Sequence, residues 1–263
     1  MVVSLSTEMS ALARRALRAS ARKIPKARNK DILQFPIAIL PDSGITRSMS
    51  QIIAVVSQKG GVGKSTLARL IAREYANAGW SVKIADLDIS RGTSFNWQAR
   101  RLQHEVEPVI AVERFGSVEQ ALKAAPLVDL MILDGPPHST AGTLMLARAA
   151  DVVILPAGLA LDDLQPTVLL AHELVGKGIS REKLAFAFCR VGDSAPEISE
   201  ARRYIVEAGY RALSGSIPEK IAYRRASDGG RALTETRFPT LNQRSDELVQ
   251  SIINVASKLR KAA

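Results

Sequence analysis

Residues 57–66, SQKGGVGKST, have the composition of a loop that binds phosphate groups. Three glycines let successive backbone N–H groups converge on an anion, because glycine tolerates the backbone angles this requires. Lys64 is placed to neutralise β- and γ-phosphates, and Ser65 is placed to ligate Mg²⁺. An apolar run precedes the loop and a helical run follows it, as such a loop requires. The common motif has glycine where this chain has Gln58, so the loop is a variant form.

A second lysine, Lys59, opens the same loop. It lies on the wrong side of the loop to reach the γ-phosphate that Lys64 would bind. A cation that faces outward suits the phosphate of a partner subunit and would act as an arginine finger does in trans. The loop therefore predicts two subunits face to face, with nucleotide between them.

Three aspartates end apolar runs of strand length. Asp134 ends LVDLMILD, and Asp86 and Asp88 lie in ADLD. A carboxylate at the carboxyl end of a strand lies on the ligand side of a doubly wound sheet. We expect Asp134 to be an outer-shell Mg²⁺ partner and Asp88, nearer the strand end, to orient the attacking water. Asp86 is as readily a structural aspartate at a strand end.

The order of apolar and helical runs predicts how these residues are positioned. Apolar runs of strand length alternate with helical runs, and near-continuous apolar strands indicate a parallel sheet buried on both faces. We predict an α/β fold with a doubly wound, mostly parallel sheet flanked by helices. The expected strands are residues 52–57, 82–88, 127–134, 151–157 and 184–191, and the expected helices are 64–78, 142–149, 163–176, 196–208 and 242–262.

The ends of the chain differ from its middle. Residues 1–50 hold nine Lys and Arg against three Asp and Glu, and we expect them to form a basic N-terminal extension. It would contain a helix over 5–23 and a Pro-rich linker with a short strand at 35–40. We expect residues 51–263 to form the nucleotide-binding domain. Its last helix carries an apolar stripe, Leu248, Ile252, Val255 and Leu259, which we expect to pack on the sheet.

Composition limits the possible functions of the chain. The formal net charge is +10, and a basic surface favours phosphate backbones or anionic lipid, although it can also be simply solvated. No apolar run reaches the roughly 18 residues of a membrane span, and no secretory signal is visible. The single cysteine, Cys189, weighs against disulfides and an iron–sulfur carrier, and the three histidines show no metal-ligand spacing. We expect a cytoplasmic protein.

The combined motifs are similar to those of one family. KGGVGKST, DLD, DGPP and the later stretch IPEKIAYRRASDGGRAL together resemble the ParA/MinD family of deviant Walker A ATPases, over about residues 51–263. The run FNWQARR and the short motif spacing look most like the small ParF-type plasmid partition proteins. Ile89, Ser90 and Arg91 stand where the family often has Pro-Gln. A tyrosine kinase of this fold would need a tyrosine-rich tail, which is missing after Tyr223.

The resemblance implies an ATPase that hydrolyses ATP to ADP and phosphate as a sandwich dimer with Mg²⁺. It implies catalytic roles for Lys59, Lys64 and Asp88, and metal roles for Ser65 and Asp134. Thr66 would hold the α-phosphate. The remaining residues that it implies for nucleotide binding are Gly60, Gly61, Val62, Gly63 and, bordering adenine, Ile217, Pro218 and Lys220.

The resemblance also implies partners and a location. An ATP-bound homodimer would bind non-specific double-stranded DNA, and would therefore associate with the nucleoid. A ParB-like centromere-binding protein would stimulate hydrolysis during segregation of plasmid or chromosomal cargo. Two alternatives stay open: a MinD-like ATPase that cycles on a membrane, and a ParA-like positioner of a protein cluster. The candidate DNA contacts are Arg224, Arg225, Arg231, Arg237 and Arg244, with Lys258, Arg260 and Lys261.

Overall fold

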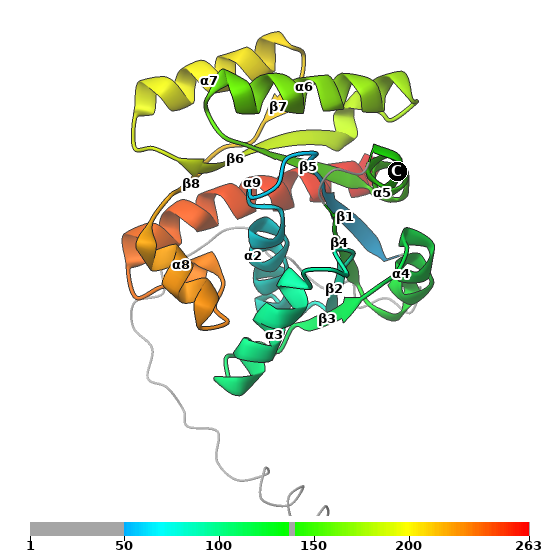
Figure 1. The fold of residues 1–263 in the computed structure, drawn as a ribbon, viewed down its shortest axis with the longest axis vertical. Helices are drawn as coiled ribbons and strands as arrows, with labels where there is room; N and C mark the ends of the chain where they lie inside the picture. Colours follow the sequence, from blue (N-terminus) through cyan, green and yellow to red (C-terminus); the bar gives the residue numbers. More distant parts are fainter. Residues whose placement is uncertain (1–49, 137–139, 263) are drawn as a thin grey trace, which may run out of the picture. The chain divides into compact units, whose positions relative to one another are not determined.

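The computed structural model describes residues 50–136 and 140–262, which contain a parallel sheet of eight strands (Figure 1). The strand order is β3-β2-β4-β1-β5-β6-β7, and β8 pairs with β6. Every pairing is parallel. The strands are β1 (Gln51–Val55), β2 (Val82–Asp86), β3 (Ala111–Arg114), β4 (Leu130–Asp134), β5 (Val152–Ala157), β6 (Leu184–Val191), β7 (Arg211–Ala212) and β8 (Ile217–Pro218).

Helices cover both faces of the sheet and divide the core in two. Ile53 and Val55 of β1 point into one apolar cluster, and Ala54 and Val56 point into the other, as the twofold period of a strand requires. One set of four helices contributes residues to the cluster that contains Ile53, and a second set of four contributes to the cluster that contains Ala54. The first set is α2 (Lys64–Asn77), α3 (Thr93–Gln103), α8 (Ile221–Asp228) and α9 (Pro239–Ala262), and the second is α4 (Val118–Ala124), α5 (Thr140–Ala149), α6 (Leu161–Gly176) and α7 (Ala195–Glu207).

The predicted doubly wound fold is therefore confirmed. β1 lies between β4 and β5, so the chain winds outward from it in two directions. The carboxyl end of such a central strand is where ligands bind in open α/β sheets. The loop that follows β1 occupies this position. Short 3₁₀ turns complete the fold at η1 (Ala125–Leu127), η2 (Arg181–Lys183) and η3 (Leu233–Glu235).

Some bounds differ from those predicted. The strand expected over 82–88 ends at Asp86, so Asp88 lies in the following loop. The prediction missed three helices, α3, α4 and α8, and three strands, β3, β7 and β8. β7 and β8 have only two residues each, and β3 lies at the sheet edge with only Val112 of its four residues buried. α9 starts earlier than expected, at Pro239, since proline is well tolerated in the first helical turn. The expected helix over 5–23 and strand over 35–40 lie outside the described residues.

The apolar stripe of α9 packs inward, as predicted. Leu248 and Ile252 are fully buried, Val255 is nearly so, and Leu259 packs against the same cluster. No helix within 50–136 and 140–262 combines the length and the apolar character that a membrane crossing needs.

A buried ion pair joins α3 to η3. Nη1 and Nη2 of Arg101 donate to the two carboxylate oxygens of Glu235 at 2.7 and 2.9 Å, and the side chain of Arg101 is 1% exposed. The Arg101 guanidinium also lies 5.4 Å from the ring centre of Trp97. Burial raises the pKa of Glu235, but the hydrogen bonds from Arg101 and from the backbone amide of Ala232 outweigh it, so this pKa lies below its usual value. The pair fixes the chain after α8 to α3.

We predict that Glu235→Gln lowers the free energy of unfolding by about 3–5 kcal/mol, because it leaves the buried Arg101 charge without its counterion. The urea midpoint of the full chain measures this. Glu207→Gln is the matched control, since Glu207 and its partner Arg203 are both about two-thirds exposed. Equal urea midpoints for the two variants would contradict the structural role of the pair.

Candidate functional site

The loop between β1 and α2 has the backbone shape of a phosphate cradle. Gly61 and Gly63 adopt φ of +77° and +105°, in the left-handed region that glycine favours. A Cβ at residue 63 would also lie 3.2 Å from the Cβ of Cys189. The sequence therefore needs glycine at residue 63 for two reasons: the backbone angle, and the close approach of β6. The loop leads directly into the N-terminus of α2, whose unpaired N–H groups and dipole favour an anion.

Lys64 turns its side chain back onto this loop. It is largely buried, and its Nζ donates to the backbone oxygen of Lys59 at 3.0 Å. Burial lowers the pKa of Lys64, and the carboxylates of Asp134 and Asp88 act in the opposite direction. A desolvated ammonium at the loop is the group that a triphosphate would attract.

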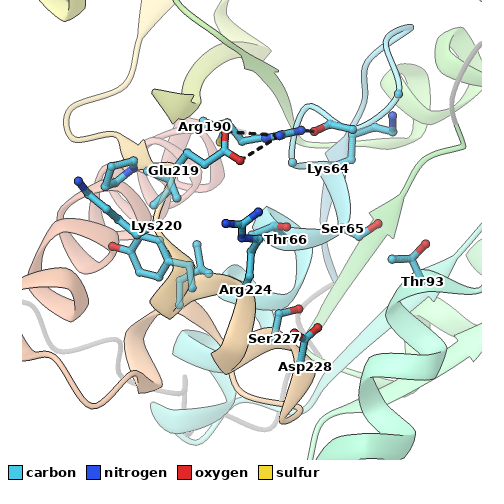
Figure 2. A pocket seen from close by; sticks show the side chains of 18 of the residues that line it. Lys64, Ser65, Thr66, Thr93, Arg190, Glu219, Lys220, Arg224, Ser227 and Asp228 are labelled. Atoms are coloured by element: carbon cyan, nitrogen blue, oxygen red, sulfur yellow. Dashed lines mark hydrogen bonds and ion pairs between the residues drawn. The ribbon is translucent and has the colours of Figure 1, made fainter. Parts of the chain in front are cut away.

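A cavity of about 550 Å³ opens beside the loop (Figure 2). Most of the residues that the sequence analysis assigned to nucleotide binding line this cavity. Val62, Lys59 and the buried Asp134 do not. The predicted residues that line it are Gly60, Gly61, Gly63, Lys64, Ser65, Thr66, Asp88, Ile217, Pro218 and Lys220. Cys189, Arg190, Glu219 and Tyr223 also line it and were not predicted.

Two aspartates lie side by side at the carboxyl edge of the sheet. Asp86 of β2 is the register partner of Asp134 of β4, and both are almost fully buried. Burial raises the pKa of Asp134 to about 6; the hydroxyls of Ser94 and Ser65 oppose this shift, and the charge of Asp86 adds to it. The Asp134 Oδ1 atom is buried without a hydrogen-bond partner among the described residues. An acceptor left over next to Ser65 fits a Mg²⁺ ion with its bound water.

Ser94 holds both carboxylates. Its hydroxyl donates to Asp134 at 2.7 Å, and its backbone N–H donates to Asp86 at 2.8 Å. Asp86 also accepts from the N–H of Phe95 at 3.0 Å, so it satisfies two free amides at the start of α3. These contacts favour a structural role for Asp86 at the end of its strand. Sequence analysis missed Ser94, although a serine two residues after Gly92, in the first turn of a helix, is a usable signal.

Of the three aspartates predicted from the sequence, Asp88 is the one that lines the cavity. It accepts from the hydroxyl of Ser90 at 2.7 Å and from the N–H of Arg91 at 3.2 Å. It is only partly buried and lines the cavity with Lys64. A carboxylate in this position can accept a hydrogen bond from water.

Arg69 extends the polar contacts of the site toward α8. Its guanidinium donates to the Ser94 hydroxyl at 3.3 Å, to the Thr93 carbonyl at 2.6 Å and to the Ser227 hydroxyl at 3.1 Å. Burial lowers the pKa of Arg69 to about 10, against the attraction of Asp134. Through this side chain, α2, α3 and α8 share one hydrogen-bonded cluster.

Lys59 points away from the cavity. Its side chain is 53% exposed, and its ammonium pairs with Asp163 in the first turn of α6. It does not line the cavity beside its own loop. This exposure agrees with the outward direction expected from the sequence, and contact with a partner's phosphate stays a prediction.

The candidate DNA-binding arginines have different surroundings. Arg224 lines the 550 Å³ cavity, and its predicted contact with DNA stays a prediction. Arg244 pairs with Asp193 at 2.8 Å, as does Lys220 at 2.5 Å. The others border a second cavity of about 1050 Å³ near the start of α9; they are Arg225, Arg231 and Arg237.

Within residues 50–136 and 140–262, no three or more His, Cys, Asp or Glu side chains are grouped so that they could hold a metal ion. Nδ1 of His172 and the hydroxyl of Tyr210 are hydrogen-bonded at 2.8 Å. Cys189 is buried, and burial raises its pKa to about 12. His138 lies outside the described residues.

Comparison with known proteins gives one family. The family model described as the CobQ/CobB/MinD/ParA nucleotide binding domain matches residues 53–233. A curated relative, maintenance of carboxysome distribution protein A from Gloeobacter kilaueensis, is 30% identical over 197 residues, which cover 74% of this chain and 88% of the relative.

Solved structures with the same fold cover most of the chain. An ATP complex of McdA from Cyanothece matches with a TM-score of 0.60 and 18% identity, over 78% of this chain and 97% of that one. MinD from Pyrococcus horikoshii, complexed with Mg-ADP, matches with a TM-score of 0.63 and 16% identity, over 80% and 99% of the two chains. At these identities the likeness establishes the fold.

We predict that Ser94→Ala lowers the free energy of unfolding by about 1–3 kcal/mol, because a buried carboxylate loses its hydroxyl donor. Urea unfolding of the full chain measures the change. Ser199→Ala, on the exposed face of α7, is the control and should leave stability within about 0.5 kcal/mol. If the two serine variants unfold at the same urea concentration, Ser94 does not hold the carboxylates.

Proposed function

The chain belongs to the CobQ/CobB/MinD/ParA family of nucleotide-binding domains, and on that basis we propose that it is an ATPase that positions a cargo along DNA. In this proposal an ATP-bound homodimer binds non-specific double-stranded DNA and releases it after hydrolysis to ADP and phosphate. The protein would then be cytoplasmic and associated with the nucleoid.

The cavity beside the loop supports the nucleotide part of the proposal. Backbone N–H groups of the loop and the ammonium of Lys64 would bind the β- and γ-phosphates, and Thr66 the α-phosphate. Ser65 would ligate Mg²⁺, with Asp134 binding through its water. The ion would neutralise charge on the phosphates as the terminal phosphoryl group leaves. Ile217, Pro218 and Lys220 line the far wall and would border the base.

Asp88 is our candidate for orienting the attacking water. Asp86 is committed to the start of α3, and Asp134 to Ser94. Asp88 keeps access to the cavity, where its carboxylate can accept a hydrogen bond from a water molecule in line with the leaving group. Positioning of this kind is the main protein contribution to phosphoryl transfer.

The outward position of Lys59 carries the proposal of a dimer. One lysine of the loop, Lys64, is buried against the loop, and the other is exposed and held by Asp163. An ion pair at an exposed site is worth little, so exchange of Asp163 for a phosphate on a second copy is energetically easy. Two copies facing each other would each complete the other's nucleotide site.

Basic side chains supply the proposed DNA contacts. Arg225, Arg231 and Arg237 surround the second cavity, and Lys258 is exposed on α9. Each phosphate neutralised releases counterions, so affinity would fall steeply with salt. A dimer doubles these contacts and raises the effective concentration of the second set. Nucleotide-driven dimerisation would therefore control DNA binding.

Two kinds of cargo fit this mechanism. The curated relative is named for carboxysome distribution, which favours the alternative that the cargo is a protein assembly. The ParF-like run FNWQARR favours plasmid partition with a ParB-like partner that stimulates hydrolysis. Membrane cycling is less supported, because the apolar stripe of α9 is buried against the sheet.

We predict that a non-hydrolysable ATP analogue with Mg²⁺ converts the wild-type chain to a dimer, whereas Lys59→Ala stays monomeric and still binds the analogue. Light scattering measures the mass, and calorimetry measures the binding. Lys177→Ala, an exposed lysine at the end of α6, is the control and should dimerise normally. A wild-type chain that stays monomeric with bound analogue would remove the working state of the proposed cycle.

We predict that Asp88→Ala lowers ATP hydrolysis at least about a hundredfold, because the water loses its acceptor, and that it prolongs ATP-dependent DNA binding. Phosphate release and gel shifts on unrelated duplexes with ATP, ADP or no nucleotide measure the two effects. Glu200→Ala, an exposed carboxylate on α7, serves as control. Normal hydrolysis by Asp88→Ala would show that another group orients the water.

A further inference from the structure

A bulge interrupts the pairing of β6 with β8, and Arg190 is the residue within it. Cys189 pairs with Ile217 and Val191 pairs with Pro218, so Arg190 lies between them as the additional residue of β6. Its φ is +59°, a left-handed backbone conformation that is unfavourable for residues other than glycine. Bulges change the direction of a side chain and are frequent beside active sites.

The side chain of Arg190 lines the 550 Å³ cavity and contacts two other lining residues, Gly61 and Glu219. Nη1 of Arg190 donates to the backbone oxygen of Gly61 at 2.8 Å, and Nη2 contacts the two carboxylate oxygens of Glu219 at 3.2 and 3.4 Å. Figure 2 shows these contacts between the loop that carries Lys64 and the wall that carries Glu219. Arg190 thus connects the phosphate end of the cavity to the end assigned to the base.

The contact with Gly61 is made to its backbone carbonyl oxygen, which accepts the hydrogen bond. A loop that directs its N–H groups at phosphates must direct carbonyl groups elsewhere, and those carbonyls need donors of their own. The Arg190 guanidinium is such a donor for Gly61. It differs from the ammonium of Lys64, which donates to Lys59 and would have to leave that carbonyl to bind phosphate.

These contacts contribute little to fold stability. The side chains of Arg190 and Glu219 are 56% and 45% exposed, and ion pairs so exposed are worth little. The strained backbone of Arg190 is itself unfavourable. Arg190 has a strained backbone, makes an ion pair that adds little stability and lines a cavity. Together these features indicate that it acts on the molecule that the cavity binds.

We infer that Arg190 is a positioning residue for the nucleotide: it holds the carbonyl of Gly61 outward, so that the loop amides face the phosphates, and fixes the loop to the Glu219 wall. This inference rests on the proposed nucleotide binding and names a residue that the sequence motifs do not contain. The guanidinium acts on the loop and does not touch the reacting phosphate.

The test compares three variants of the full chain. Arg190→Gly removes the guanidinium and relieves the left-handed backbone, so it should fold at least as well as the wild type. Arg190→Lys keeps a donor within reach of Gly61 but cannot bridge to Glu219 in the same geometry. Arg203→Ala removes an exposed arginine of α7 and serves as the control. Calorimetry with Mg-ATP and with inorganic triphosphate gives the dissociation constants, and thermal unfolding gives the melting temperature.

We expect Arg190→Gly to weaken binding of Mg-ATP and of triphosphate about tenfold each, with no loss of melting temperature. Arg190→Lys should recover at least half of the loss for triphosphate. Unchanged binding by Arg190→Gly, or an equal loss in Arg203→Ala, would overturn the role of Arg190. A lower melting temperature without recovery by lysine would also overturn it. Failure of the wild-type chain to bind Mg-ATP would instead overturn the proposed function.

Discussion

Two carboxylates, Asp86 and Asp134, are buried next to each other at the carboxyl edge of the sheet, and the start of α3 donates hydrogen bonds to both. Parallel register places them there, and like charges in a low dielectric repel strongly. Ser94 offsets this by giving its N–H to one and its hydroxyl to the other. Because Arg69 donates to Ser94 from α2 and to Ser227 in α8, the state of these carboxylates affects three helices. The phosphate loop and its walls are therefore built around this contact.

Three basic side chains surround the loop after β1, and each has a different environment. Lys64 is desolvated inside the loop, Lys59 is exposed and paired with Asp163, and Arg190 approaches the loop from β6. Each cation meets a different side of one short turn. Two glycines with left-handed φ allow this, since the chain reverses direction there within a few residues. A single turn can then serve its own nucleotide, a neighbouring subunit and the far wall of the cavity.

Much of the fold and of the site follows from local sequence, and the exceptions have physical reasons. Long apolar runs such as that of β6 identify the parallel strands, because both faces are buried. The glycines and Lys64 identify the phosphate loop, because the spacing fixes the chemistry. β3 was missed, since only Val112 of this edge strand is buried. Arg190 could not be found, because a bulge depends on pairing with β8, which is distant in sequence. That Arg224 lines the cavity could not be predicted, because a basic residue carries no signal of the surface it faces.

The position of Cys189 has a practical consequence. It is the only cysteine of the chain, it is buried behind Gly63, and its pKa is raised to about 12. A thiol so protonated and enclosed reacts slowly with maleimides or methanethiosulfonates. A cysteine introduced on the surface would therefore be the preferred attachment point for a fluorophore or spin label, with the native residue left in place. Distances between two copies could then be followed in solution by energy transfer or by electron spin resonance.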